Sequence, residues 1–84
     1  MPTISVFYGI AIMMYQIDKE HNPPHIHAFY GEKFGIFSIT NGEMLNGDFP
    51  KKGIKLVKEF ISRYKDELLE MWATGLFKRL PGLE

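Results

Sequence analysis

HIHAFYGEKFGIFSI, residues 25–39, carries the clearest structural pattern in the sequence. Two runs rich in β-forming residues, 25–30 and 34–39, flank the glycine-containing loop 31–33. A loop of this length and composition commonly joins two antiparallel strands. The stretch therefore predicts a β-hairpin near the middle of the chain.

A second hairpin is predicted ahead of the first one. The runs 3–7 and 10–15 flank Tyr8 and Gly9, and Gly9 can supply the positive φ of a tight turn. The first run alternates apolar and polar residues, as a strand with one wet face does. The second run is apolar on both faces, which indicates a central strand or one that a partner covers.

Two Asn-Gly dipeptides, at 41–42 and 46–47, follow the central hairpin. The first is a strong turn signal and predicts a short edge strand over residues 43–45. The second marks the end of the sheet, ahead of a helix.

A helical pattern follows Pro50, which is tolerated in the first turn of a helix. Apolar residues recur there at steps of three and four, the spacing of one buried helix face. They are Ile54, Val57, Ile61, Tyr64, Leu68 and Met71. The pattern predicts one helix from about residue 50 to about residue 72, with Asp48 close enough to cap its start and Gly75 near its end.

Together these elements predict a single domain over residues 1–84 with an α+β fold. An antiparallel β-meander of four or five strands packs against one long C-terminal helix, which makes two layers. One helix covers only part of a sheet, and the strand over 10–15 is apolar on both faces. We therefore expect a protein partner, in a homodimer or a hetero-complex.

The composition excludes several classes of protein. With 45% apolar residues and no net charge, the 84-residue chain is neither disordered nor a general binder of polyanions. It has no cysteine, so neither a disulfide nor a thiolate zinc site can form. No run reaches the roughly 18 apolar residues of a membrane span. We expect a cytoplasmic protein without membrane contact.

All three histidines lie in HNPPHIH, residues 21–27. The two prolines fix their own φ and push the preceding residue into an extended conformation, so the segment is stiff. His25 and His27 are two residues apart in a predicted strand and must share one face. His21 precedes the prolines and is placed separately.

This histidine segment has several possible roles. His21, His25 and His27 could bind a divalent transition metal such as zinc, nickel or iron, with a water completing the site. They are equally candidates for catalytic acid–base chemistry on a phosphodiester, because histidine titrates near neutral pH. They could instead be structural, donating to backbone carbonyls, or could contact a partner.

Charges on the predicted helix run against its dipole. Lys51, Lys52 and Lys55 lie near its start, whereas acidic residues gather near its end. Lysines beside free backbone N–H groups make an anion-binding site that would suit phosphate, RNA or an acidic partner. The alternative is a solvated face with pairs one turn apart, Lys55 with Glu59 and Arg63 with Glu67.

Four segments together resemble one family of small bacterial proteins, the domain of unknown function DUF4160. They are MPTI at 1–4, HNPPHIHA at 21–28, GEMLNG at 42–47 and ELLEMW at 67–72. The resemblance covers nearly the whole chain, and HNPPHIHA is its most specific part. The predicted helix departs from the family pattern at Phe60 and Tyr64, where tryptophan and histidine are expected, so a mechanism that needs a helical histidine is not implied.

The resemblance implies no established activity. Members of the family are often encoded beside a second small protein, an arrangement similar to toxin–antitoxin pairs, and this implies a hetero-partner. We therefore expect a protein-binding module of a two-gene toxin–antitoxin-like or regulatory pair. The alternative is a small histidine- or metal-dependent hydrolase, such as an endoribonuclease, that uses His21, His25 and His27. Whether the chain is an enzyme stays open.

Overall fold

The computed structural model describes residues 3–15 and 23–83 of the chain. Within them lie five strands and two helices: β1 (Thr3–Phe7), β2 (Ile10–Met13), β3 (His25–Tyr30), β4 (Lys33–Ser38), β5 (Met44–Asp48), α1 (Lys51–Arg63) and α2 (Lys65–Thr74). The strands follow one another in the sheet in chain order, and each is antiparallel to the next. The prediction of an antiparallel α+β meander is confirmed. The bounds of β1 and β3 are the predicted ones, and those of β2, β4 and β5 differ by one to three residues.

The central hairpin, β3 and β4, forms the middle of the sheet. Ile26 pairs with Phe37 and Ala28 pairs with Gly35, and all four residues are buried. A side chain at Gly35 would meet the ring of Phe37 at 2.8 Å, so that ring occupies the space above the glycine. Alternation along β3 therefore gives the sheet one tightly packed face.

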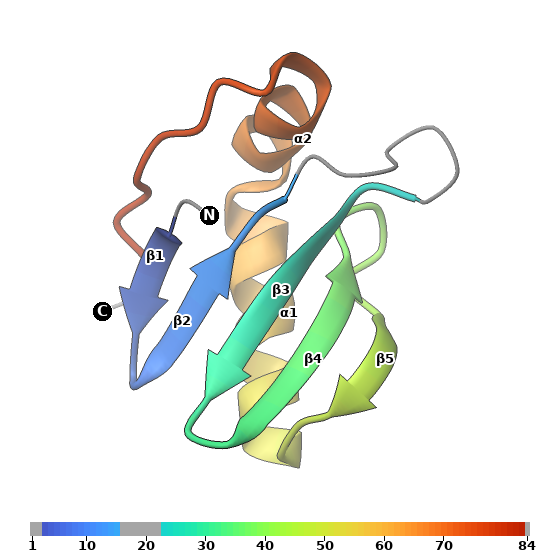
Figure 1. The fold of residues 1–84 in the computed structure, drawn as a ribbon, viewed down its shortest axis with the longest axis vertical. Coiled ribbons are helices and arrows are strands. Elements are labelled where there is room, and N and C mark those ends of the chain that lie inside the picture. Colours follow the sequence, from blue (N-terminus) through green and yellow to red (C-terminus); the bar gives the residue numbers. More distant parts are fainter. Residues whose placement is uncertain (1–2, 16–22, 84) are drawn as a thin grey trace.

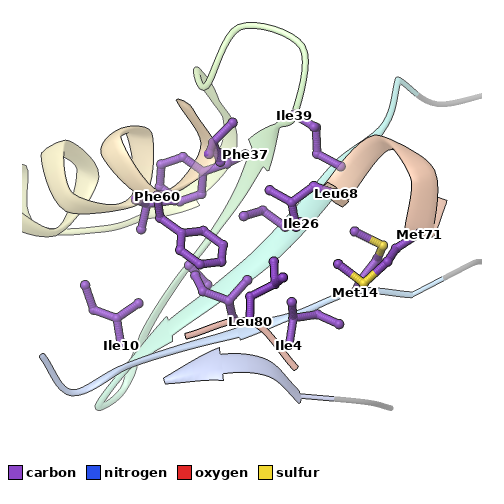
Figure 2. Packing of buried hydrophobic residues seen from close by; sticks show 14 of the residues in the cluster. Ile4, Ile10, Met14, Ile26, Phe37, Ile39, Phe60, Leu68, Met71 and Leu80 are labelled. Carbon is purple, nitrogen blue, oxygen red and sulfur yellow. The ribbon is translucent and has the colours of Figure 1, made fainter. Parts of the chain in front are cut away.

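Both helices contribute to the core on this face. In Figure 1, α1 lies behind the sheet and α2 lies at the end where β3 begins. Phe60 of α1 stacks on Phe7 of β1 with ring centroids 4.9 Å apart, and α2 contributes Leu68 and Met71 (Figure 2). The core thus lies between one face of the sheet and a layer of two helices.

The prediction of one long helix over 50–72 is wrong, because the helix breaks at Tyr64. This residue has φ −115° and ψ 25°, so α1 ends and α2 begins there. Its ring packs on that of Phe60 with centroids 5.1 Å apart, and its hydroxyl donates to the carbonyl of Gly82 at 3.1 Å. Helical hydrogen bonds are present on both sides of Tyr64, so this one residue changes the direction of the chain and turns α2 toward the end of the sheet. The spacing of apolar residues along the sequence continues through the bend.

The predicted edge strand over 43–45 and the predicted cap at Asp48 also need correction. Strand β5 runs on through Gly47 to Asp48, because Leu45 forms a bulge and Gly47 adopts φ 108°. Asp48 accepts from Lys33 at 2.9 Å instead of capping the helix. The residue at the N-terminus of α1 is Pro50, which makes no side-chain cap bond.

The segment 75–83 covers the edge of β1, a role that the sequence did not reveal. Gly75 ends α2 in the left-handed conformation, near the predicted end of the helix. The segment then runs beside β1 (Figure 1), where the N–H of Leu80 donates to the carbonyl of Ile4 at 2.8 Å. The hydroxyl of Ser5 donates to the carbonyl of Leu80 at 2.9 Å. The edge that β1 would otherwise present to solvent is therefore occupied.

Two glycines allow a test of the path of β5. An alanine side chain at Gly47 would meet the carbonyl oxygen of Phe34 at 2.5 Å and Cα of Gly35 at 2.7 Å. At Gly31, which also has positive φ, it would meet nothing within 4 Å. We expect Gly31→Ala to lower the free energy of unfolding by roughly 1 kcal/mol, from backbone strain alone, and Gly47→Ala to lower it by roughly 3 kcal/mol. Urea unfolding measures both, and equal losses would contradict the close approach of β5 to β4 at Gly47.

Candidate functional site

His25 and His27 project from β3 on the face of the sheet opposite to the core. Ile26 and Ala28 between and beside them are fully buried, whereas both histidines are half-buried. Their ring centroids lie 5.3 Å apart. The strand spacing predicted that the two would share a face, and the structure places them as a neighbouring pair.

His21, the third predicted member of the site, lies outside the described residues. Within residues 3–15 and 23–83, no three histidine or acidic side chains gather where they could hold a metal ion. The part of the site that can be described is therefore the pair His25 and His27.

The double-proline corner fixes the state of His25. Nδ1 of this ring lies 2.9 Å from the carbonyl oxygen of Pro23. A carbonyl can only accept, so Nδ1 carries the hydrogen, and Nε2 of the neutral ring keeps its lone pair. The next carbonyl, of Pro24, accepts from the N–H of Ile39 at 2.9 Å, which ties the corner to the chain that follows β4.

Aromatic rings flank the histidine pair on both sides. Tyr15, just beyond β2, meets His27 edge-on with centroids 4.4 Å apart. The ring centroid of Trp72, in α2, lies 4.9 Å from that of His25. Tyr15, His27, His25 and Trp72 thus form a continuous row, which we call the imidazole row. Contact with the buried Trp72 gives His25 a packing role.

Burial lowers the pKa of His27 from its ordinary value of 6.5, and the neighbouring His25 lowers it further. Burial disfavours the charged imidazolium, and a second imidazole that can itself become charged disfavours it again. His27 is therefore predominantly neutral at pH 7. A neutral imidazole can accept a proton, a hydrogen bond or a metal ion.

The pair lies within a largely apolar surface, the open face of the sheet. Its half-buried or exposed members are the apolar or aromatic residues Val6, Ala11, Met13, Tyr15, Phe29, Phe34, Ile36 and Leu45, the two histidines, and the polar residues Thr3, Asn46 and Asp48 at its margins. Of these, Val6 is 49% exposed, Phe34 44% and Leu45 49%. No element that Figure 1 draws in colour covers this face.

Sequence reasoning recognised only part of the open face. It identified 10–15 as apolar on both sides, and Ala11, Met13 and Tyr15 do lie there. It missed Phe29 and Phe34, which pair across the hairpin with ring centroids 6.4 Å apart. The signal was available, since both runs of the central hairpin carry apolar residues at odd and even positions.

The predicted anion site lies on the other side of the sheet. Lys51, Lys52 and Lys55 are exposed near the start of α1, which has no acidic residue in its first turn. Lys52 lines a groove of about 510 Å³ together with Tyr8 and Tyr30. The ion pair nearby joins Glu59 and Arg63 at 3.8 Å, rather than the two pairs that the solvated-face alternative predicted. The lysines and histidines do not form one site.

The lowered pKa of His27 predicts that the chain loses stability as pH falls below about 6.5. The unfolded chain takes up a proton on this residue near pH 6.5 and the folded chain only at lower pH, so acidification favours unfolding. We expect the free energy of unfolding to be lower at about pH 5.5 than at about pH 7.5, with a smaller difference in His27→Gln. Urea unfolding with a chelator present measures this, and an NMR titration midpoint for His27 at or above 6.5 would contradict it.

Comparison with known proteins identifies one family. The family described as Domain of unknown function (DUF4160) matches residues 9–73, which is more than half of the chain and includes the imidazole row. Strand β1 and the segment 75–83 lie outside the matched range. Neither the search of curated proteins nor the search of solved structures gives a match. In the described residues no helix is long and apolar enough to cross a membrane. The chain belongs to the DUF4160 family.

Proposed function

We propose that this chain is a cytoplasmic protein-binding module, one half of a two-gene pair of the toxin–antitoxin-like or regulatory kind, which docks its partner on the open face. The observation that carries the proposal is the apolar character of that face. Val6, Phe34 and Leu45, on three different strands, are each nearly half exposed. Contiguous apolar surface of this kind marks an interaction site on a small protein.

The charge pattern of the open face favours an apolar partner surface. The ion pair between Lys33 and Asp48 lies at one end of the sheet, beside Phe34 in the register. The centre of the face carries apolar side chains and the two imidazoles, and His27 is predominantly neutral at pH 7. A partner segment with charges at its centre would bury them without a counter-charge, which is costly.

The size of the open face suits a small helical layer. Five strands spaced about 4.8 Å apart, each about five residues long, give a face of roughly 19 by 17 Å. Helices with side chains are about 10 Å wide, so two fit side by side. The opposite face already holds such a layer, α1 and α2. We therefore take the partner to present an amphipathic helical pair or an element of similar width.

The gene arrangement implied by the family favours a hetero-partner over a second copy. A histidine-based hydrolase such as an endoribonuclease is the weaker proposal, because the third group that it needs is not among the residues described near His25 and His27. Lys51, Lys52 and Lys55 lie on the other side of the sheet, so a phosphate or RNA bound there would leave the open face free.

Substitutions on the open face test the proposal. The chain is co-expressed with the small protein encoded beside it, and the affinity of the purified pair is measured. We expect Val6→Lys and Phe34→Lys each to weaken binding by more than about tenfold, because each replaces roughly 2 kcal/mol of apolar burial by a lysine. Both side chains are nearly half exposed in the chain without a partner, so the fold tolerates the change.

Leu76→Lys is the matched control. Leu76 is 77% exposed and lies in the segment after α2 rather than in a strand of the sheet, so this variant should bind like the wild type. A wild-type chain that stays monomeric at high micromolar concentration and does not bind the neighbouring protein would refute the proposal. A homodimer that Phe34→Lys dissociates would refute the two-gene version and assign the face to a second copy.

A further inference from the structure

We propose that His25 and His27 chelate one late first-row divalent metal ion, such as Cu²⁺ or Zn²⁺, through one nitrogen of each ring. Two imidazoles form the described part of the site, and the open coordination positions take water. This proposal does not depend on the docking proposed for the open face.

The separation of the rings fits a shared ion. A metal–nitrogen bond of about 2.0–2.1 Å puts the ion about 3.2 Å from the centroid of a ligating imidazole. Centroids 5.3 Å apart then subtend roughly 110° at the ion, close to the tetrahedral angle. Residues two apart on a strand keep this spacing without any backbone movement.

The donor atoms are available. Nδ1 of His25 is engaged with the carbonyl of Pro23, which leaves Nε2 as the donor. Metal-binding histidines commonly donate their other N–H to a carbonyl in this way, which fixes the tautomer. His27 makes no hydrogen bond in the described part of the chain. No buried side-chain nitrogen or oxygen there lacks a partner, so the nitrogens of His27 reach solvent.

The pair is held in place before an ion arrives. Pro23 and Pro24 fix the approach to β3, and Ile39 holds the carbonyl of Pro24. The rings of Tyr15 and Trp72 flank the two imidazoles. Little conformational entropy remains to be lost on binding, which favours chelation by only two side chains.

The chemistry of the donors selects the metal. Imidazole suits zinc, copper and nickel, whereas magnesium and calcium prefer oxygen ligands. Among divalent ions the affinity is highest for Cu²⁺. Two protein ligands leave positions for water, so the bound ion stays exchangeable.

Trp72 is a built-in reporter of binding. It is the only tryptophan of the chain, and its ring lies 4.9 Å from that of His25. Cu²⁺ bound to His25 should therefore quench the tryptophan emission strongly. Chain prepared without a polyhistidine tag is titrated with Cu²⁺ alone. We expect saturable quenching with one ion per chain, reversed by a chelator.

Two histidine variants and one surface variant make the test specific. We expect His25→Gln and His27→Gln to shift the midpoint at least about tenfold, because each removes a ligand. Phe34→Lys should keep the wild-type midpoint, which separates this proposal from the docking proposal. Thermal unfolding checks that each variant is folded. If His25→Gln, which also loses contact with Trp72, is unstable, His27→Gln carries the comparison.

Two results would overturn the proposal. The first is the absence of saturable quenching in the wild-type chain. The second is a Cu²⁺ titration midpoint that is the same in His27→Gln as in the wild type.

Discussion

The alternation of side chains along β3 is the constraint on which the rest of the structure depends. Ile26 and Ala28 must point toward the helices to complete the core, so His25 and His27 must point away from them. A shift of one residue would bury two imidazoles and expose two core side chains. The hydrogen bond from the N–H of Ile39 to the carbonyl of Pro24 extends the β3–β4 pairing and opposes such a shift. The site therefore has its geometry because the core has its register.

The helical layer covers the core face of the sheet, and the C-terminal segment covers the edge next to it. The bend at Tyr64 turns α2 back over the end of the sheet, and the hydroxyl of Tyr64 holds the segment near Gly82. That segment places Leu80 on Ile4 at the edge of β1. The core face and one edge are thereby covered from within the chain, whereas the open face is left to solvent or a partner. The imidazole row lies within the residues that match the family, 9–73, whereas β1 and the segment 75–83 lie outside them.

Local patterns predicted the strands well because strand signals are local. Alternation and turn residues gave the hairpin around Gly31 and the shared face of His25 and His27. The bend at Tyr64 escaped prediction because apolar spacing continues through it and one residue alone leaves the helical conformation. The length of β5 escaped because an Asn-Gly pair that usually ends a strand forms part of one here.

Contacts between distant parts of the chain were beyond any local pattern. The bond between Ser5 and Leu80 joins residues 75 positions apart. The packing of Trp72 on His25 likewise joins the end of the last helix to the start of the central strand. The sequence therefore indicated which histidines form the pair, while what surrounds them depends on tertiary structure.

The sequence left several roles for HNPPHIH, among them a stiff structural corner and a chemical site, and over residues 23–27 the structure makes these two compatible. A structural role for His25 uses the contact of its ring with Trp72 and the hydrogen bond from its Nδ1 to the carbonyl of Pro23. Chemistry needs only the lone pair on Nε2, which neither contact consumes. The same hydrogen bond that makes the corner rigid also fixes the tautomer with the free donor. An apolar ring at position 25 could pack on Trp72 but could not donate to the carbonyl of Pro23, so the structural role alone already favours an imidazole there. The structural role of His25 and the proposed chelation therefore use different parts of one side chain.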